Sequence, residues 1–221
     1  GQSNAYSVNN QILRTLVMQR TAPFETVYRY RAELRGDWDV RVDYRFSAPL
    51  GSSSNVGVLG TALGAEFGSA GTSKASVGRL VDVDATDHRY AVDWGQGPTS
   101  DMPTTAVAGT FRLVRTGWEV AGYVWDAGSN DWQIVGTMDG YTDETARVGL
   151  KVWSTGTFSG KSAYFYSDNL MLANGRASLA GLAVKTFGLD GAGEPTVAWD
   201  SAGMPTNTRV VVTRATSLVD S

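Results

Sequence analysis

Hydrophobic and polar residues alternate along much of this 221-residue chain. The segments ETVYRYRAEL, residues 25–34, and DWDVRVDYRFS, residues 37–47, both place apolar side chains at every second position. This period of two predicts strands with one face in a hydrophobic core and the other in water. Arg35 and Gly36 stand between the two segments and predict a tight turn, so that the two strands would form a hairpin.

Further strand candidates follow at regular intervals, separated by turn-rich segments such as APLGSSS and MDGYTDE. They are Asn55–Thr61, Ser76–Asp82, His88–Trp94, Gly109–Thr116, Trp118–Asp126, Asp131–Thr137, Arg147–Thr155 and Ser162–Leu172. Only Ile12–Met18 fits one face of a helix as well as a strand. Short strands at such spacing predict an all-β protein, a two-sheet antiparallel sandwich.

The composition changes at Ala173-Asn174-Gly175, which predicts a β-sandwich over residues 1–174 and a C-terminal β extension or partial appended module over 175–221. The extension contains three strand candidates, Leu182–Leu189, Thr196–Asp200 and Arg209–Ala215. Three strands are too few for an independent sandwich. They would pack on the main domain, belong to a truncated module or pair with another chain.

Charge and composition exclude several classes of function. The net charge is −3 with both signs interspersed, so neither nucleic acid nor an acidic membrane surface is an expected partner. Because there is no cysteine, disulfides, thiolate metal sites and cysteine catalysis are excluded. No apolar run approaches the ~18 residues of a membrane span. The chain begins with Gly1, which predicts a processed chain or an excised segment whose signal peptide is already removed.

Five segments resemble, in the same order, strands of concanavalin A-like (LamG-like) lectin and glucanase jelly rolls. They are AYSVNNQILR, GDWDVRVDYRF, FRLVRTGWEVAGYVWDAGSNDWQIVG, ARVGLKVWS and AYFYSDNLML. The resemblance covers residues 5–172 and implies a jelly-roll sandwich of the bacterial exported type, with Ile12–Met18 as a strand. It does not choose a function, because this fold hosts lectins, glucanases, lyases and adhesion modules.

The sequence contains no recognisable catalytic constellation. The E-x-D-x-x-E pattern of jelly-roll glucanases, which brings two carboxylates to hydrolytic spacing, is absent. RAELR, residues 31–35, resembles the arginine-rich strand of alginate lyases, but the Gln-x-His strand of those enzymes is missing and His88 is the single histidine. Asp39 and Asp43 share a face with Arg41, which predicts a ladder of ion pairs. The sequence thus favours a non-enzymatic protein.

Two acidic segments are candidates for calcium, which prefers oxygen ligands. Asp82, Asp84 and Asp87 lie within six residues, but a polar strand end that runs into a turn is the favoured explanation for them. Asp168 follows Tyr164 and Tyr166, on a parity that we expect to face inward. The resemblance implies that the matching aspartate holds a structural calcium ion, and the alternative is that Asp168 caps backbone amides at the sheet end.

Aromatic residues on polar strand faces are the strongest candidates for ligand binding. Flat rings stack on the apolar faces of sugars, while polar neighbours hydrogen-bond their hydroxyls. Trp132 and Ile134 lie opposite polar neighbours, so we expect them in the core. The candidate ligand-binding residues are Tyr123, Trp125, Trp153, Arg147 and Lys151. The alternative is that the tail or loops cover these rings.

The sequence therefore favours non-catalytic binding of a polysaccharide or other glycan by a protein outside the cell or on its surface. The main alternative is a self-associating extracellular filament subunit, in which TRVVVTRATSLV, residues 208–219, completes the sheet of a neighbouring copy. A glycoside-active enzyme is a third hypothesis.

Overall fold

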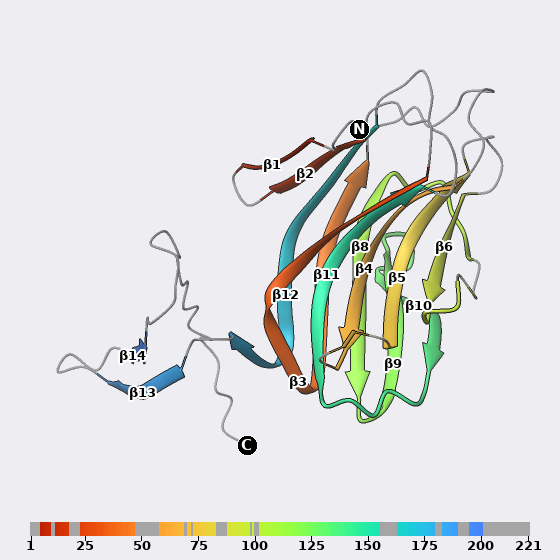
Figure 1. Cartoon of the computed structure of the whole chain (residues 1–221). Helices are drawn as coiled ribbons and strands as arrows, with labels where there is room; N and C mark the ends of the chain where they lie inside the picture. The colour runs from red at the N-terminus through yellow and green to blue at the C-terminus, as the bar shows by residue number, and fades with distance from the viewer. Residues whose placement is uncertain are drawn as a thin grey trace. The chain divides into compact units, whose positions relative to one another are not determined.

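The computed structural model describes residues 5–9, 12–17, 23–46, 58–68, 70–71, 73–82, 88–97, 99, 102–154, 163–179, 183–189 and 195–200. The elements in this part of the chain are β-strands, as the alternating pattern predicts (Figure 1). They are β1 (Ala5–Asn9), β2 (Ile12–Val17), β3 (Phe24–Phe46), β4 (Val58–Phe67), β5 (Ser73–Asp82), β6 (His88–Asp93), β7 (Met102–Pro103), β8 (Ala108–Thr116), β9 (Glu119–Asp126), β10 (Asp131–Met138), β11 (Thr145–Ser154), β12 (Ala163–Leu179), β13 (Ala183–Leu189) and β14 (Pro195–Asp200).

The chain divides into two compact units, residues 1–178 and 179–221. β12 continues through Ala173–Gly175, where the sequence pattern predicted an interruption. In the second unit, β13 and β14 form an antiparallel pair. The strand predicted over Arg209–Ala215, and with it the segment predicted to add to a neighbouring copy, lies outside the described residues.

The predicted hairpin around Gly36 is wrong. Residues 24–46 form one long strand, β3, in which Gly36 has a φ of +62°. The half Phe24–Arg35 pairs with β11, and the half Trp38–Arg45 pairs with β8. The left-handed glycine conformation therefore bends the strand from one sheet into the other instead of reversing it. A tight turn and a bend use the same glycine signal, so the sequence alone did not separate them.

The two sheets that β3 joins form the layers of a sandwich. One layer has the strand order β3-β11-β4-β5-β6-β7. In the other, β8 pairs with β3 and β9, and β9 pairs with β10. β12 lies beside β3 and connects through β2 to β1. All the pairings described are antiparallel, so the prediction of an all-β, two-sheet antiparallel sandwich is confirmed.

Aromatic residues from both layers fill the core between the sheets. Trp38 of β3 stacks on Phe67 of β4 at 6.2 Å between ring centroids. Tyr44 stacks on Phe111 at 4.1 Å, and its hydroxyl lies 2.7 Å from the hydroxyl of Tyr90 on β6. Burial raises the pKa of Tyr44, so the Tyr44 hydroxyl stays neutral. The hydrogen bond thus links the two layers within the core.

The prediction that Trp132 and Ile134 lie in the core is wrong. Trp132 pairs with Trp125 of β9, Ile134 pairs with Tyr123, and Ile134 is 51% exposed. A bulge between Ile134 and Gly136 then changes the side of the sheet to which the strand's residues point, and Val135 is the buried residue of β10. The simple alternation missed this bulge, which is a common feature of edge strands.

Candidate functional site

The structure separates the five predicted ligand-binding residues into two groups. Arg147, Lys151 and Trp153 alternate on β11 with the buried residues of that strand, so they lie on the outer face of the β3-β11-β4-β5-β6 sheet. Tyr123 and Trp125 alternate in the same way on β9, in the other sheet. Because the sheets pack through their inner faces, the two groups lie on opposite sides of the sandwich. They do not form one binding surface.

Arginine side chains cover the rings on the Tyr123 face. Trp125 packs edge-on against Trp132, with centroids 5.3 Å apart. The guanidinium of Arg112 lies 5.2 Å from the Tyr123 ring centroid and 5.3 Å from that of Trp132, and Arg41 lies 5.3 Å from the same Trp132 centroid. These cation–π contacts occupy ring faces that a sugar would need.

The same arginines hold a buried carboxylate, Asp39. Arg41 and Arg112 donate to Asp39 Oδ2 from their Nη2 atoms at 2.8 and 2.9 Å. Burial alone would raise the pKa of Asp39, but the hydrogen bonds from the two arginines outweigh it and lower the pKa. Of the predicted ladder, the ion pair between Asp39 and Arg41 is present, whereas Asp43 accepts hydrogen bonds from Thr110 and Asn169. The role of Asp39 and its two arginines is structural, since they tie β3 to β8.

Trp125 also lines a hollow at the edge of this sheet. The hollow has a volume of about 330 Å³, and Tyr90, Met102 and Gln133 lie in its wall. Asp126 also lies in the wall of the hollow. Its carboxylate accepts hydrogen bonds from Ser129 and Gln133 and so stabilises the turn between β9 and β10. The polar groups nearby thus serve the protein's own turn.

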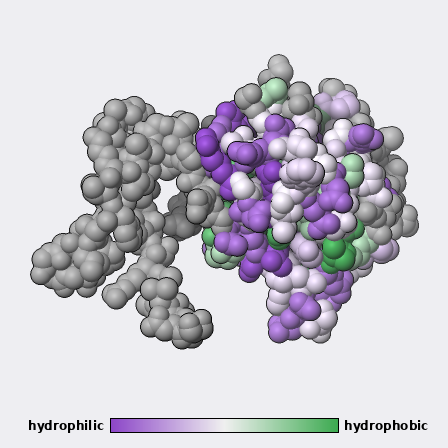
Figure 2. All heavy atoms as spheres, turned by 90° about the horizontal axis from the view of Figure 1, so that it is seen from below, coloured by the Kyte–Doolittle hydropathy of each residue, from purple (hydrophilic) through white to green (hydrophobic). Residues whose placement is uncertain are grey.

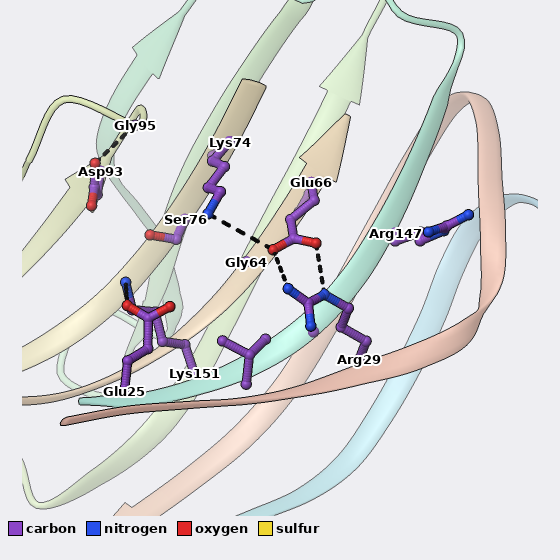
Figure 3. A pocket seen from close by; sticks show the side chains of 14 residues that line it. Glu25, Arg29, Gly64, Glu66, Lys74, Ser76, Asp93, Gly95, Arg147 and Lys151 are labelled. Carbon is purple, nitrogen blue, oxygen red and sulfur yellow. Dashed lines mark hydrogen bonds and ion pairs between the residues drawn. The ribbon is translucent and has the colours of Figure 1, made fainter. Parts of the chain in front are cut away.

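The outer face of the β3-β11-β4-β5-β6 sheet has a groove whose floor is formed by glycine and serine residues. Adjacent strands place one row of residues across the sheet in register: Arg29, Gly149, Gly64, Ser76 and Asp93. The three central members are glycine or serine, and around them lies a hollow of about 60 Å³, called here the glycine groove (Figure 3). Such a volume holds several water molecules, which ligand hydroxyls could replace.

Ion pairs line the glycine groove. Arg29 donates to Glu66 through Nε at 2.7 Å and through Nη2 at 2.9 Å, and Lys74 Nζ lies 4.0 Å from the same carboxylate. Lys151 Nζ lies 2.8 Å from Glu25 (Figure 3). The hydrogen bonds from Arg29 lower the pKa of Glu66, so Glu66 is ionised and is a poor proton donor at neutral pH.

The third carboxylate of the groove, Asp93, accepts hydrogen bonds from the backbone amides of Gly95 and Gly97 at 2.8 and 3.0 Å. Each lining carboxylate therefore already has a cationic or backbone partner. Such an arrangement can present donors and acceptors to hydroxyl groups. Hydrolysis of a glycosidic bond requires one carboxyl group that donates a proton, and the lowered pKa of Glu66 does not favour that role.

Trp153 lies against the sheet beside this groove. A Cβ atom added to Gly60 would come within 2.5 Å of its ring, so the indole packs directly on the glycine backbone. Lys151 Nζ lies 4.9 Å from the ring centroid. Because Gly60 has no side chain, there is room for the Trp153 ring at this position. Trp153 follows Lys151 on the same face of β11.

Sequence reasoning found Arg147, Lys151 and Trp153 but missed Arg29, Glu66 and the glycine floor. A signal for the floor exists in GTALGAEF, where Gly60, Ala62 and Gly64 occupy every second position. This parity is the outward one in β4, where Gly64 is partly exposed while Gly60 and Ala62 are covered. The register that brings Gly64 beside Gly149 comes from pairing distant segments, which the alternation does not determine.

Asp168 has a different environment from the predicted one. The buried residues of this part of β12 are Phe165 and Ser167, so Tyr164 and Asp168 face outward. The Asp168 carboxylate accepts a 2.7 Å hydrogen bond from the Asn169 amide, as a backbone cap would.

Calcium binding is not supported by the donors around this residue. The described part of the chain has no group of three acidic or histidine side chains that could hold a metal ion, whereas calcium takes six to eight oxygen ligands. Asp84 and Asp87 of the other acidic segment lie outside the described residues. Calcium at Asp168 remains a prediction.

Comparison with known proteins identifies the fold. No family model and no curated protein matches the sequence. A functionally unknown protein from Saccharomyces cerevisiae matches with a TM-score of 0.54 at 9% identity, over 78% of this chain and 92% of that one. The PL7 alginate lyase AlyA1 from the marine Zobellia galactanivorans matches with a TM-score of 0.53 at 10% identity, over 78% and 81%. The fold is a concanavalin A-like jelly roll.

At such identities the likeness shows the fold alone. A legume lectin-like domain from Entamoeba histolytica is also similar, with a TM-score of 0.49 at 8% identity over 77% of this chain and 88% of that one. No helix in the described part of the chain is long and apolar enough to cross a membrane. Figure 2 shows one side of the molecule, where hydrophilic residues prevail and hydrophobic ones form only small patches.

Proposed function

We propose that this protein binds carbohydrate non-catalytically in the glycine groove of its jelly roll. The observation that carries the proposal is the row across five strands in which Gly149, Gly64 and Ser76 form a floor between charged side chains. A flat floor lets a sugar approach the sheet closely, and the charged groups beside it can hydrogen-bond its hydroxyls. Trp153 adds an aromatic surface at one side.

Two further observations bear on the proposal. Glu25, Glu66 and Asp93 each already have a cationic or backbone partner, and the hydrogen bonds from Arg29 lower the pKa of Glu66. The fold likeness to AlyA1, which is named as an alginate lyase, is compatible with a carbohydrate ligand. Glycan binding also implies an extracellular or cell-surface protein, of the exported type that the sequence resemblance implies.

A comparison of two tryptophans tests which face binds. We expect Trp153→Ala to weaken binding to the best ligand of a polysaccharide panel by about tenfold, because a stacked ring contributes on the order of 1 kcal/mol. Trp125→Ala is the matched control, because its ring is also half-buried but lies on the opposite face. Affinity electrophoresis or calorimetry measures the effect in variants whose folding circular dichroism has verified. Loss of binding in Trp125→Ala alone would place the ligand on the other sheet.

A further inference from the structure

We infer that the glycine groove selects acidic glycans, whose carboxylate or sulfate groups bind at a cation cluster formed by Arg29, Lys74 and Arg147. This inference rests on the proposed function and adds the class of ligand. The three side chains come from β3, β5 and β11 and all line the groove. The chain as a whole is acidic, so a local gathering of cations is not expected from its composition.

The cationic side chains of this cluster are more exposed to solvent than the carboxylates with which they pair. The side chains of Arg29, Lys74 and Arg147 are 52%, 53% and 46% exposed. Their carboxylate partners are more covered: Glu66 is 20% exposed and Glu33 is 26% exposed. The cationic side chains are therefore more accessible than the carboxylates, and a ligand approaching from solvent meets positive charge first.

The charges within the cluster do not cancel. Arg29 and Lys74 share the single carboxylate of Glu66, while Arg147 pairs with Glu33 at 2.8 Å. Among these three cations and two carboxylates one positive charge is left over, and the negative charge of Asp93 lies on β6, at the other side of the groove. The ion pair with Glu66 uses Nε and Nη2 of Arg29, so the third nitrogen, Nη1, lies outside that pair. Figure 3 shows Glu66 between Lys74 and Arg29 at the side of the groove.

An anionic substituent of a sugar fits the size of the glycine groove and the charge of the cation cluster. A carboxylate or a sulfate is small enough for a hollow of about 60 Å³. Guanidinium groups bind both anions through paired hydrogen bonds, and ammonium groups bind them as point charges. The glycine floor then carries the sugar ring to which the acidic group is attached.

The test compares polymers that differ in charge: dextran, dextran sulfate and polygalacturonate. We expect wild-type protein to bind at least one of the two acidic polymers and not dextran, with an affinity that falls as salt is added. The variant Lys74→Gln/Arg147→Gln should bind about tenfold more weakly. The control Arg45→Gln removes an exposed charge from the half of β3 that pairs with β8, in the other sheet, and should bind like the wild type.

The sulfate and uronate polymers separate the two sources of negative charge. Equal weakening by the control variant would indicate general attraction of polyanions and would overturn the inference. Equally strong binding of single-stranded DNA, with the same response to the cluster variant, would also overturn it. Binding restricted to neutral polysaccharides, and lost in Gly64→Val, would overturn the selectivity but leave the proposed function intact. If no polysaccharide of any charge binds, both fail.

Discussion

Gly64→Val is expected to reduce glycan binding by at least about tenfold while the protein remains folded. A Cβ at position 64 would lie 3.5 Å from Ala75 O and 3.5 Å from Ser76 Cβ, which are ordinary contacts. Valine also suits a strand. Its methyl groups would fill the floor where the sugar is proposed to lie, so the variant separates loss of the site from loss of the fold. Binding by calorimetry and the midpoint of urea unfolding measure the two effects.

Thr137→Val is a suitable control, because Thr137 is exposed on β10 in the other sheet. Gly149→Ala is a poorer test, since its Cβ would lie 3.0 Å from the carbonyl oxygen of Tyr28 and the sheet would have to shift. If Gly64→Val binds the ligand as tightly as the wild type does, the ligand does not occupy the glycine groove.

The largest effect on stability is expected at Arg79, whose side chain is fully buried. Its guanidinium donates to the carbonyl oxygens of Ala106 at 3.1 Å, Thr104 at 3.0 Å and Arg89 at 3.3 Å, and also to that of Leu80. Burial lowers the pKa of Arg79, because removing the charged guanidinium from water is unfavourable. The hydrogen bonds offset this cost and tie residues 104–106 to the edge of the sheet.

We expect Arg79→Ala to lower the free energy of unfolding by about 3–4 kcal/mol, because it leaves a cavity and removes the donors of several carbonyl groups. Arg79→Lys keeps the charge but not the planar fork, so it should lose about half as much. Urea unfolding followed by tryptophan fluorescence measures both variants. A loss below about 0.5 kcal/mol in Arg79→Ala, the range of ordinary surface substitutions, would show that water replaces the guanidinium without penalty.

The alternation of residues predicted the strands well because each side chain's face follows directly from its position in the sequence. It predicted that one face of residues 37–47 lies in the core, and Trp38 and Tyr44 of that face are buried. It was wrong wherever backbone geometry interrupts the period. Gly36 bends β3 between two sheets, and a bulge after Ile134 changes the outward side of β10. Both depend on which strand lies alongside, and that is information about tertiary structure.

The candidate site shows the same limit. Arg147, Lys151 and Trp153 were predicted because they lie close together on one strand. The sequence could not show that Trp125 belongs to the opposite face, since parity within a strand does not say which sheet the strand joins. Nor could it bring Gly64 beside Gly149, 85 residues apart in the numbering, because their pairing is set by strand order.

The most direct test of the account is a titration of ¹⁵N-labelled protein with an oligosaccharide of the best-binding polysaccharide, followed by amide chemical shifts. The account predicts that the largest shifts occur at Gly64, Ser76 and Gly149, on three adjacent strands of one sheet. Largest shifts at Tyr123 and Trp125, with the groove amides unchanged, would contradict it and place binding on the opposite face.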